Sequence, residues 1–194
     1  MNITIKADEI DKIKESIWTI MSTNGYTDTQ ANVLLKLFDY MIENQLMGGC
    51  HALSSVLYVA FSELGLDVQL HIGECKTANR PPFDHSWITL NGKIIDLAIY
   101  MPLDNRFVSY PIVCGVEAIT MLNPNIQYGV NTGLPFSFDT QRVIDWPFNE
   151  YMSAFPKGNN GLWTVVHKIL PSTFNVSNKK LMRKYNDTKR RIWR

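Results

Sequence analysis

The chain of 194 residues has few of the features that mark an exported, metal-binding or membrane-spanning protein. Its three cysteines, Cys50, Cys75 and Cys114, form no C-x-x-C pair, which argues against a zinc site. It contains no run of about 18 uncharged apolar residues, which excludes a membrane-spanning helix. The N-terminal segment alternates apolar and charged residues and lacks the apolar core of a signal peptide. We therefore expect a cytoplasmic protein with free thiols and without a metal or cofactor.

The apolar content suits a folded domain, and the charge is unevenly distributed. Hydrophobic residues make up 45% of the chain and charged residues 19%, so the chain is not of the disordered class. The formal net charge of +1 conceals a value of −6 for residues 1–178 and of +7 for residues 179–194. We expect a single domain over 1–178, followed by a basic C-terminal tail over 179–194.

The basic tail is a candidate contact surface. If residues 179–194 are helical, their apolar side chains fall roughly on one stripe, with basic side chains elsewhere. That pattern suits an acidic partner, nucleic acid or an anionic membrane surface. The alternative is that the stripe packs on the acidic body. The apolar residues concerned are Leu181, Met182, Tyr185, Ile192 and Trp193.

Apolar periodicity predicts three helices in the N-terminal third of the chain. Residues 8–22 form one amphipathic stripe, which ends at Asn24-Gly25. Thr27 and Gln30 have the spacing of a capping box, and a second stripe follows from Val33 to Ile42. The third helix, Cys50 to Leu64, is apolar on most of its circumference, which is typical of a buried helix.

Strands are predicted after these helices, and the pattern weakens beyond Tyr100. Leu66–Ile72 alternates as a half-buried strand, and a turn-rich stretch, Lys76–Asp84, follows. Asn91-Gly92 between two β-prone runs predicts a two-residue hairpin that pairs His85–Leu90 with Lys93–Ile99. Farther along, we expect short strands and one helix. The expected strands are Phe107–Cys114 and Leu162–Ile169, and the expected helix is Thr140–Ala154.

Cys50 is the candidate nucleophile because it opens a buried helix directly after Gly48-Gly49. A helix N-terminus presents unpaired N–H groups and a partial positive charge, which favour thiolate over thiol. The thiolate is the nucleophilic form of cysteine. A buried, inert thiol is the alternative, so Cys50 needs partner residues to carry a chemical role.

The hairpin supplies a base and an acid. With Asn91-Gly92 as the turn, Trp87 faces Asp96, and His85 is the diagonal neighbour of Asp96 on the same face. A carboxylate on an otherwise apolar strand is costly unless it is paired, and His85 is the nearest partner. An acid that orients an imidazole, which in turn meets a nucleophile, is the logic of a catalytic triad.

In their order and spacing, these residues resemble the transglutaminase-like branch of the papain-fold cysteine enzymes. The resemblance covers about residues 45–100 and implies an α+β fold, in which a helical layer with the nucleophile helix packs on an antiparallel sheet. It implies Cys50 as nucleophile, His85 as base and then acid, and Asp96 as the orienting residue. Arylamine N-acetyltransferases and lasso-peptide leader peptidases have a similar architecture. The matching segments are Gly49-Cys50, His85-Ser86-Trp87 and Gly92 to Asp96.

Two further residues are candidates at this site, and two positions depart from the family pattern. Gln45 is the best side-chain candidate for the oxyanion hole, together with the Cys50 backbone N–H. Trp87 is a candidate substrate-binding residue, with a core position as the alternative. Leu97 replaces the proline that commonly follows the aspartate, and His51 replaces the usual aromatic residue after the cysteine. Because His51 points about 100° away from Cys50 around the helix, we expect it at the rim.

Two functions are compatible with these residues. The first is thiol-dependent acyl transfer, or amide or peptide hydrolysis, through an acyl-enzyme on Cys50, with a peptide, protein or small acyl compound as substrate. The second is a catalytically inactive transglutaminase-like binding module. The remaining histidine and cysteine residues have no candidate base or nucleophile near them in the sequence, and we interpret them as structural. They are His71, His167, Cys75 and Cys114.

Overall fold

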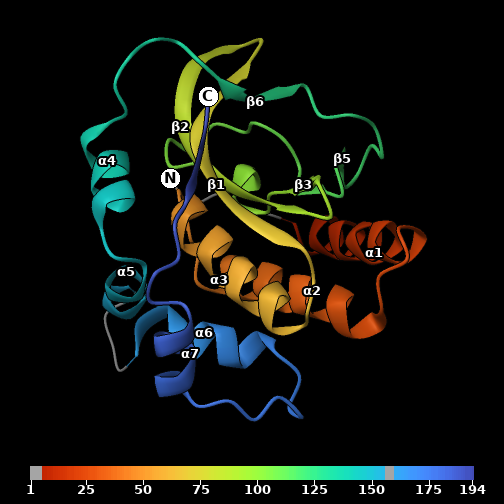
Figure 1. The fold of residues 1–194 in the computed structure, drawn as a ribbon. Helices are drawn as coiled ribbons and strands as arrows, with labels where there is room; N and C mark the ends of the chain where they lie inside the picture. The colour runs from red at the N-terminus through yellow and green to blue at the C-terminus, as the bar shows by residue number, and fades with distance from the viewer. Residues whose placement is uncertain (1–5, 156–159) are drawn as a thin grey trace.

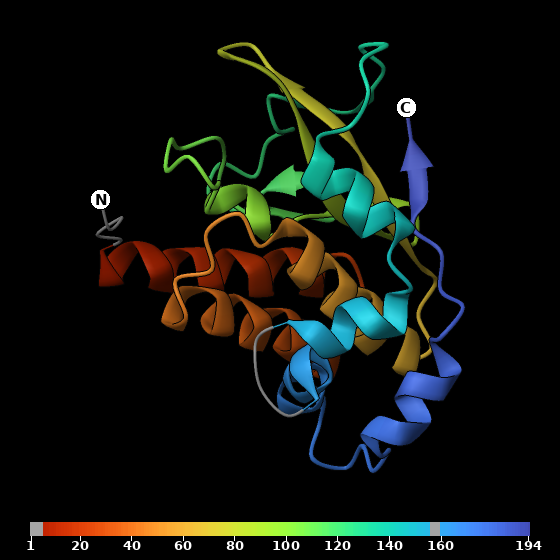
Figure 2. The ribbon, with the colours of Figure 1, turned by 90° about the vertical axis from the view of Figure 1, so that its left-hand side faces the viewer.

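The computed structural model describes residues 6–155 and 160–194, and it has an α+β fold. A curled sheet lies above helices α1 to α3, with α4 beside the sheet and α5 beside the helical layer on the same side (Figure 1). The α3 helix lies between the sheet and α6, which forms the lower layer (Figures 1 and 2). The helices of the described residues are α1 (Ala7–Thr23), α2 (Asp28–Glu43), α3 (Cys50–Glu63), α4 (Phe138–Asp145), α5 (Phe148–Ala154), α6 (Gly161–Ile169) and α7 (Asn178–Lys184).

The first three helices confirm the sequence prediction. At the start of α2, the Thr27 hydroxyl accepts from the Gln30 backbone N–H, and the Gln30 side chain accepts from the Thr27 N–H, as a capping box requires. The α3 helix is buried around most of its circumference because it has the sheet on one side and α6 on the other. Its first residue, Cys50, is largely buried and lies next to the sheet.

The main sheet has the strand order β3-β2-β1-β6, and β7 pairs with β1 beside β6. The predicted hairpin register is confirmed, because Ile88 pairs with Ile95 and Leu90 with Lys93 across Asn91-Gly92. The strands of the described residues are β1 (Val68–Thr77), β2 (Arg80–Leu90), β3 (Lys93–Ile95), β4 (Ile112–Val113), β5 (Val116–Glu117), β6 (Ile126–Val130) and β7 (Arg191–Trp193).

Two boundaries around this hairpin differ from the prediction. The stretch Lys76–Asp84, expected to be turn-rich, belongs mostly to β1 and β2, which pair as a long antiparallel ribbon. The pair Pro81-Pro82 suggested a turn, but both prolines belong to strand β2. They lie near the tip of the ribbon, where the register between β1 and β2 shifts and a strand tolerates proline. The predicted strand Lys93–Ile99 ends at Ile95, and Ala98–Tyr100 forms a short 3₁₀ helix instead.

Beyond Tyr100, the predictions are partly wrong. Residues 162–169, expected as a strand, form helix α6, since their apolar side chains recur at helical spacing and face the core. Of the expected strand Phe107–Cys114, only Ile112–Val113 pairs. The helix expected over Thr140–Ala154 is two helices, α4 and α5, interrupted at Trp146-Pro147, because proline lacks the N–H that a helix interior needs.

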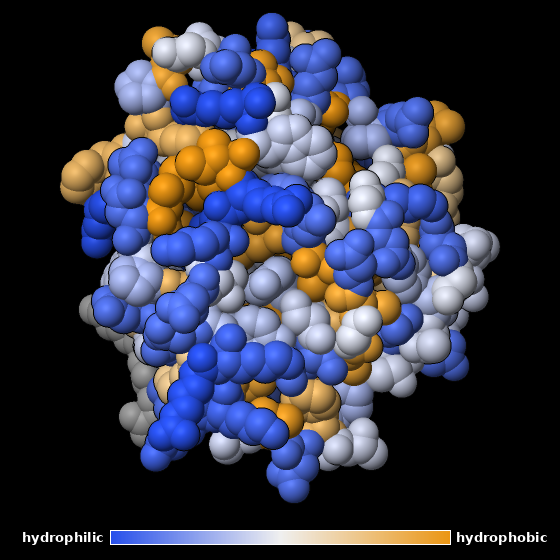
Figure 3. Space-filling model, viewed as in Figure 1, coloured by the Kyte–Doolittle hydropathy of each residue, from blue (hydrophilic) through white to orange (hydrophobic). Residues whose placement is uncertain are grey.

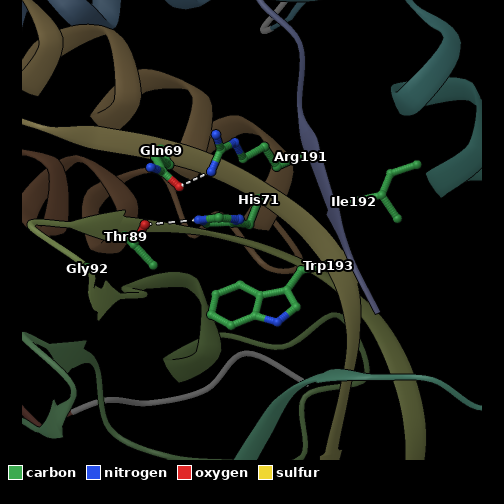
Figure 4. A pocket seen from close by; sticks show the side chains of 7 residues that line it. All are labelled: Gln69, His71, Thr89, Gly92, Arg191, Ile192 and Trp193. Atoms are coloured by element: carbon green, nitrogen blue, oxygen red, sulfur yellow. Dashed lines mark hydrogen bonds between the residues drawn. The ribbon is translucent and has the colours of Figure 1, made fainter.

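The basic C-terminal segment packs on the body and is not one continuous helix. It forms α7 as far as Lys184, whose ammonium group pairs with Glu63 of α3, and it ends in the parallel strand β7. In the close view of β7, Arg191 donates to Gln69 on β1, and Trp193 lies beside His71 (Figure 4). The corner over α6 and α7 is predominantly hydrophilic (Figure 3). The acidic body and basic segment therefore meet within one fold.

Candidate active site

Cys50 occupies the first position of α3, where its backbone is at the positive end of the helix. The first backbone bond at this end is donated by Leu53 to the Gly49 carbonyl, so the preceding N–H groups have no acceptor within the helix. The side chain is largely buried, with 8% of the residue exposed, and it lines an open cleft. A thiol at this position experiences the partial positive charge of the helix end.

His85 and Asp96 form a buried pair beside this thiol. His85 Nε2 lies 2.7 Å from Asp96 Oδ2, with 7% and 1% of the two side chains exposed. Because Nε2 faces the carboxylate, Nδ1 is the nitrogen left for the Cys50 side chain, with which His85 interacts. Cys50, His85 and Asp96 are thus brought together in the order that a triad requires.

Asp96 reaches His85 from a backbone position other than the one expected. The register would have paired it with Trp87, but β3 ends one residue earlier, and Asp96 makes an isolated backbone bridge with Ile112. Its Oδ1 accepts from the Ile99 N–H at 3.2 Å, at the start of the 3₁₀ turn. The carboxylate is therefore fixed by a turn and a bridge while still contacting the imidazole.

Tyr128 is a fourth member of the site that the sequence did not indicate. It lies on β6, opposite Cys75 of β1, and its hydroxyl donates to Asp96 Oδ2 at 2.8 Å. Burial and the Asp96 carboxylate raise the pKa of Tyr128 well above its usual value, so that it remains a proton donor. The only signal for it was a short alternating segment, Ile126–Val130, in a part of the chain without a motif.

The electrostatics favour an ion pair between the nucleophile and the base. Burial alone would raise the pKa of Cys50, but the imidazoles of His51 and His85 outweigh it and hold this pKa well below the usual value. Burial alone would lower the pKa of His85, but Asp96 and Cys50 outweigh it and raise the value to about 10. Between these two pKa values, the site holds a thiolate and an imidazolium.

His51 lies at the rim of the cleft, as expected, and it also interacts with the Cys50 thiol. Its Nδ1 lies 2.6 Å from Ser86 Oγ on β2. The helical rotation of 100° gave no indication of the interaction with Cys50, but side chains of the first turn lean towards the helix N-terminus. A long imidazole can therefore reach back to the residue before it.

The structure does not bring Gln45 and Trp87 into the cleft beside Cys50. Gln45 is exposed in the turn after α2, with a backbone φ of 49°, and it is not among the cleft residues. Trp87 is fully buried and packs on Tyr128 and Trp193, behind the pair of His85 and Asp96. The predicted oxyanion and substrate-binding roles of these two residues gain no support from their positions.

The cleft in front of Cys50 has a volume of about 580 Å³, which falls in the range of small-molecule and peptide sites. The tip of the β1–β2 ribbon lines one side, and the loop after the 3₁₀ turn and the start of α4 line others. At its mouth, Arg80 and Arg106 both bind Asp104 and hold its pKa well below the usual value. Apolar side chains contribute much of the lining, namely Pro81, Pro82, Phe83, Ile99, Pro102 and Leu103.

A second pocket, of about 360 Å³, lies between β1 and β7 and contains none of the triad residues (Figure 4). The His71 side chain in it is hydrogen-bonded to Thr89 at 2.9 Å, and burial together with Arg191 lowers the pKa of His71 to about 4. His71 is therefore an uncharged, structural imidazole at neutral pH. Cys75 and Cys114 are buried, and burial raises the pKa of both thiols, which makes them poor nucleophiles.

Within residues 6–155 and 160–194, no group of three or more His, Cys, Asp and Glu side chains is placed to hold a metal ion. No helix in the same part of the chain is both long enough and apolar enough to cross a lipid bilayer. Comparison of the chain with family models, with curated proteins and with solved structures gives no match.

Proposed function

We propose that this protein is a cysteine-dependent acyl-transfer enzyme or amide hydrolase, with Cys50 as nucleophile, His85 as base and acid, and Asp96 as the orienting residue. The observation that carries the proposal is the buried contact of 2.7 Å between His85 and Asp96, in a histidine that also interacts with the Cys50 thiol on a helix N-terminus. A histidine with a purely structural role needs neither a buried carboxylate partner nor a position beside an open cleft, so this arrangement favours a functional site.

The chemistry proceeds in two stages. The Cys50 thiolate attacks the carbonyl carbon of an amide, ester or thioester, and the carbonyl electron pair moves to oxygen. The intermediate collapses to an acyl-enzyme as His85 gives its Nδ1 proton to the leaving group. Water or an amine, deprotonated by His85, then attacks the acyl carbon and releases Cys50. Asp96 stabilises the imidazolium throughout and retains its negative charge.

The order of the elements supports a papain-like, transglutaminase-like arrangement. The nucleophile opens a buried helix, the base lies on a strand of the adjoining sheet, and the acid follows the next antiparallel strand. Leu97 after the aspartate and His51 after the cysteine depart from the family pattern. They border the triad without displacing it, so we propose this class for the protein from its site rather than from its whole chain.

Mass spectrometry of the acyl-enzyme tests this proposal. The protein is incubated with a panel of peptide, isopeptide and acyl-thioester substrates, quenched in acid and digested. We expect one acyl group per chain, carried by Cys50, while Cys75 and Cys114 remain unmodified because they are buried and have raised pKa values. If no substrate acylates Cys50, the inactive binding module is the better description.

Acylation should have a bell-shaped dependence on pH. As pH falls below the lowered pKa of Cys50, the thiolate gains a proton and the rate falls. As pH rises through about 10, His85 loses the proton that the leaving group needs, and the rate falls again. Rates of acylation under single-turnover conditions, from pH 4 to pH 11, check both limbs. An alkaline limb near the ordinary histidine value of about 6.5 would contradict the raised pKa of His85.

A further inference from the structure

The side chain of His51 has an unusual position, because it provides a second imidazole at the nucleophile. His51 and Cys50 are adjacent in α3, and both line the cleft of about 580 Å³. The hydrogen bond of 2.6 Å to Ser86 uses Nδ1 of His51, which leaves Nε2 for the interaction with the Cys50 sulfur. Ser86 lies on β2 directly after His85, and the same strand therefore fixes both imidazoles.

The protonation of Nε2 follows from what it faces. A thiolate has no hydrogen to donate, so a hydrogen bond between it and the imidazole requires a hydrogen on Nε2. If His51 is neutral, the Ser86 hydroxyl donates to Nδ1, and if His51 is charged, Nδ1 donates to the hydroxyl. In both states, Nε2 carries a hydrogen that can be donated to the sulfur. This arrangement differs from His85, whose Nδ1–H is the proton that is transferred.

We propose that His51 is a further catalytic residue, whose Nε2–H stabilises the Cys50 thiolate and then the oxyanion of the tetrahedral intermediate. When the sulfur bonds to the carbonyl carbon, the negative charge moves from sulfur to the adjacent oxygen. The same N–H, together with the Cys50 backbone N–H, then lies beside the new charge. His51 keeps its proton while His85 transfers one. This inference rests on the proposed acyl-transfer function and supplies the donor that the exposed Gln45 does not.

Other titratable groups face the thiol and are held constant in the test. His85 on β2, Cys75 on β1 and Tyr151 on α5 interact electrostatically with Cys50, and Asp96 lies behind His85. Burial raises the pKa values of Cys75 and Tyr151, which leaves them uncharged near neutral pH. The acid limb of Cys50 reactivity therefore reports on the two imidazoles.

The experiment compares His51→Leu, which removes the donor, with His51→Gln, whose side-chain amide places an N–H close to the Nε2 position. We measure alkylation of Cys50 by iodoacetamide across pH and acylation by a thioester probe. We expect His51→Leu to shift the acid limb of alkylation to higher pH and to slow acylation by about 10²–10³-fold, as expected when an oxyanion donor is lost. His51→Gln should recover most of the acylation rate.

Controls separate this role from a structural one and from failure of the proposed function. His167→Leu, which removes a part-buried imidazole on α6 outside the cleft, should leave both measurements unchanged. If His51→Leu does not fold, His51→Gln and Ser86→Ala carry the test, with a slower acylation expected for Ser86→Ala. The proposal is overturned if a folded His51→Leu matches the native protein, or if His51→Gln is as slow as His51→Leu. If native Cys50 alkylates but is never acylated, the acyl-transfer proposal has failed, while alkylation still measures the His51 contact with the thiolate.

Discussion

Replacing Cys50 with alanine is expected to lower the acylation rate by about 10⁴-fold or more, because no other thiol in the described residues can take over. Cys75 is fully buried, and burial raises its pKa well above the usual value. Cys114 contacts the Met21 sulfur within the core, away from the cleft. Single-turnover acylation by a thioester probe, followed by mass spectrometry, measures the loss.

Cys114→Ala is the matched control for this substitution. It also removes a buried thiol, but from a position that touches neither His85 nor the cleft, so acylation should proceed at the native rate. The melting temperatures of both variants show whether packing is affected. Residual acylation of Cys50→Ala at a rate near that of the native protein would place the nucleophile elsewhere and remove the basis of the proposed function.

Replacing Asp96 with asparagine is expected to slow acylation by about 10³–10⁴-fold while leaving the fold intact. Asp96 Oδ1 accepts from the Ile99 N–H, and Oδ2 accepts from His85 and Tyr128. An asparagine that keeps the Ile99 bond turns its NH₂ group towards His85. Nε2 must then accept a hydrogen bond from this NH₂ group, so a neutral imidazole carries its hydrogen on Nδ1. With a hydrogen already bound, Nδ1 cannot take the proton of the Cys50 thiol.

The loss of charge also predicts a change in pH dependence. Asp96 is a principal cause of the raised pKa of His85, so the asparagine variant should show an alkaline limb well below pH 10. Tyr128→Phe is the contrasting variant, because it removes one hydrogen bond to Asp96 and keeps the carboxylate. We expect it to lower the free energy of unfolding by about 1–3 kcal/mol, with a far smaller effect on acylation. Equal losses of activity in the two variants would show that the charge and tautomer are not what matters.

The parts of this fold that were predictable from sequence are those determined by neighbouring residues. The helices α1 to α3 follow from apolar stripes, and the register of the β2–β3 hairpin follows from Asn91-Gly92. The contact between His85 and Asp96 was predicted from that register, and it is present although β3 ends at Ile95. A diagonal contact between long side chains tolerates such a change because it depends on the turn more than on continued pairing.

The contacts that sequence reasoning missed depend on distant segments. Tyr128 reaches Asp96 only because β6 pairs with β1, and no local pattern specifies that pairing. The error at α6 has another cause, since a short apolar run such as Leu162–Ile169 fits both a strand and a buried helix. The interaction of His51 with Cys50 was also missed, because an angle around the helix axis says little about a long side chain at the first turn.

The parallel strand β7 has a consequence for association between chains. β6 pairs with β1 from Glu74 to Thr77, and β7 covers the same edge from His71 to Gly73, so the two strands together close one side of β1. The space that Trp193 fills is open because Gly73 and Gly129 have no side chain there. A chain with β7 undocked would present bare backbone beside the apolar ring of Trp87, which is a template for strand exchange and aggregation. While β7 is docked, this stretch of the sheet edge is covered and offers no free backbone for such pairing.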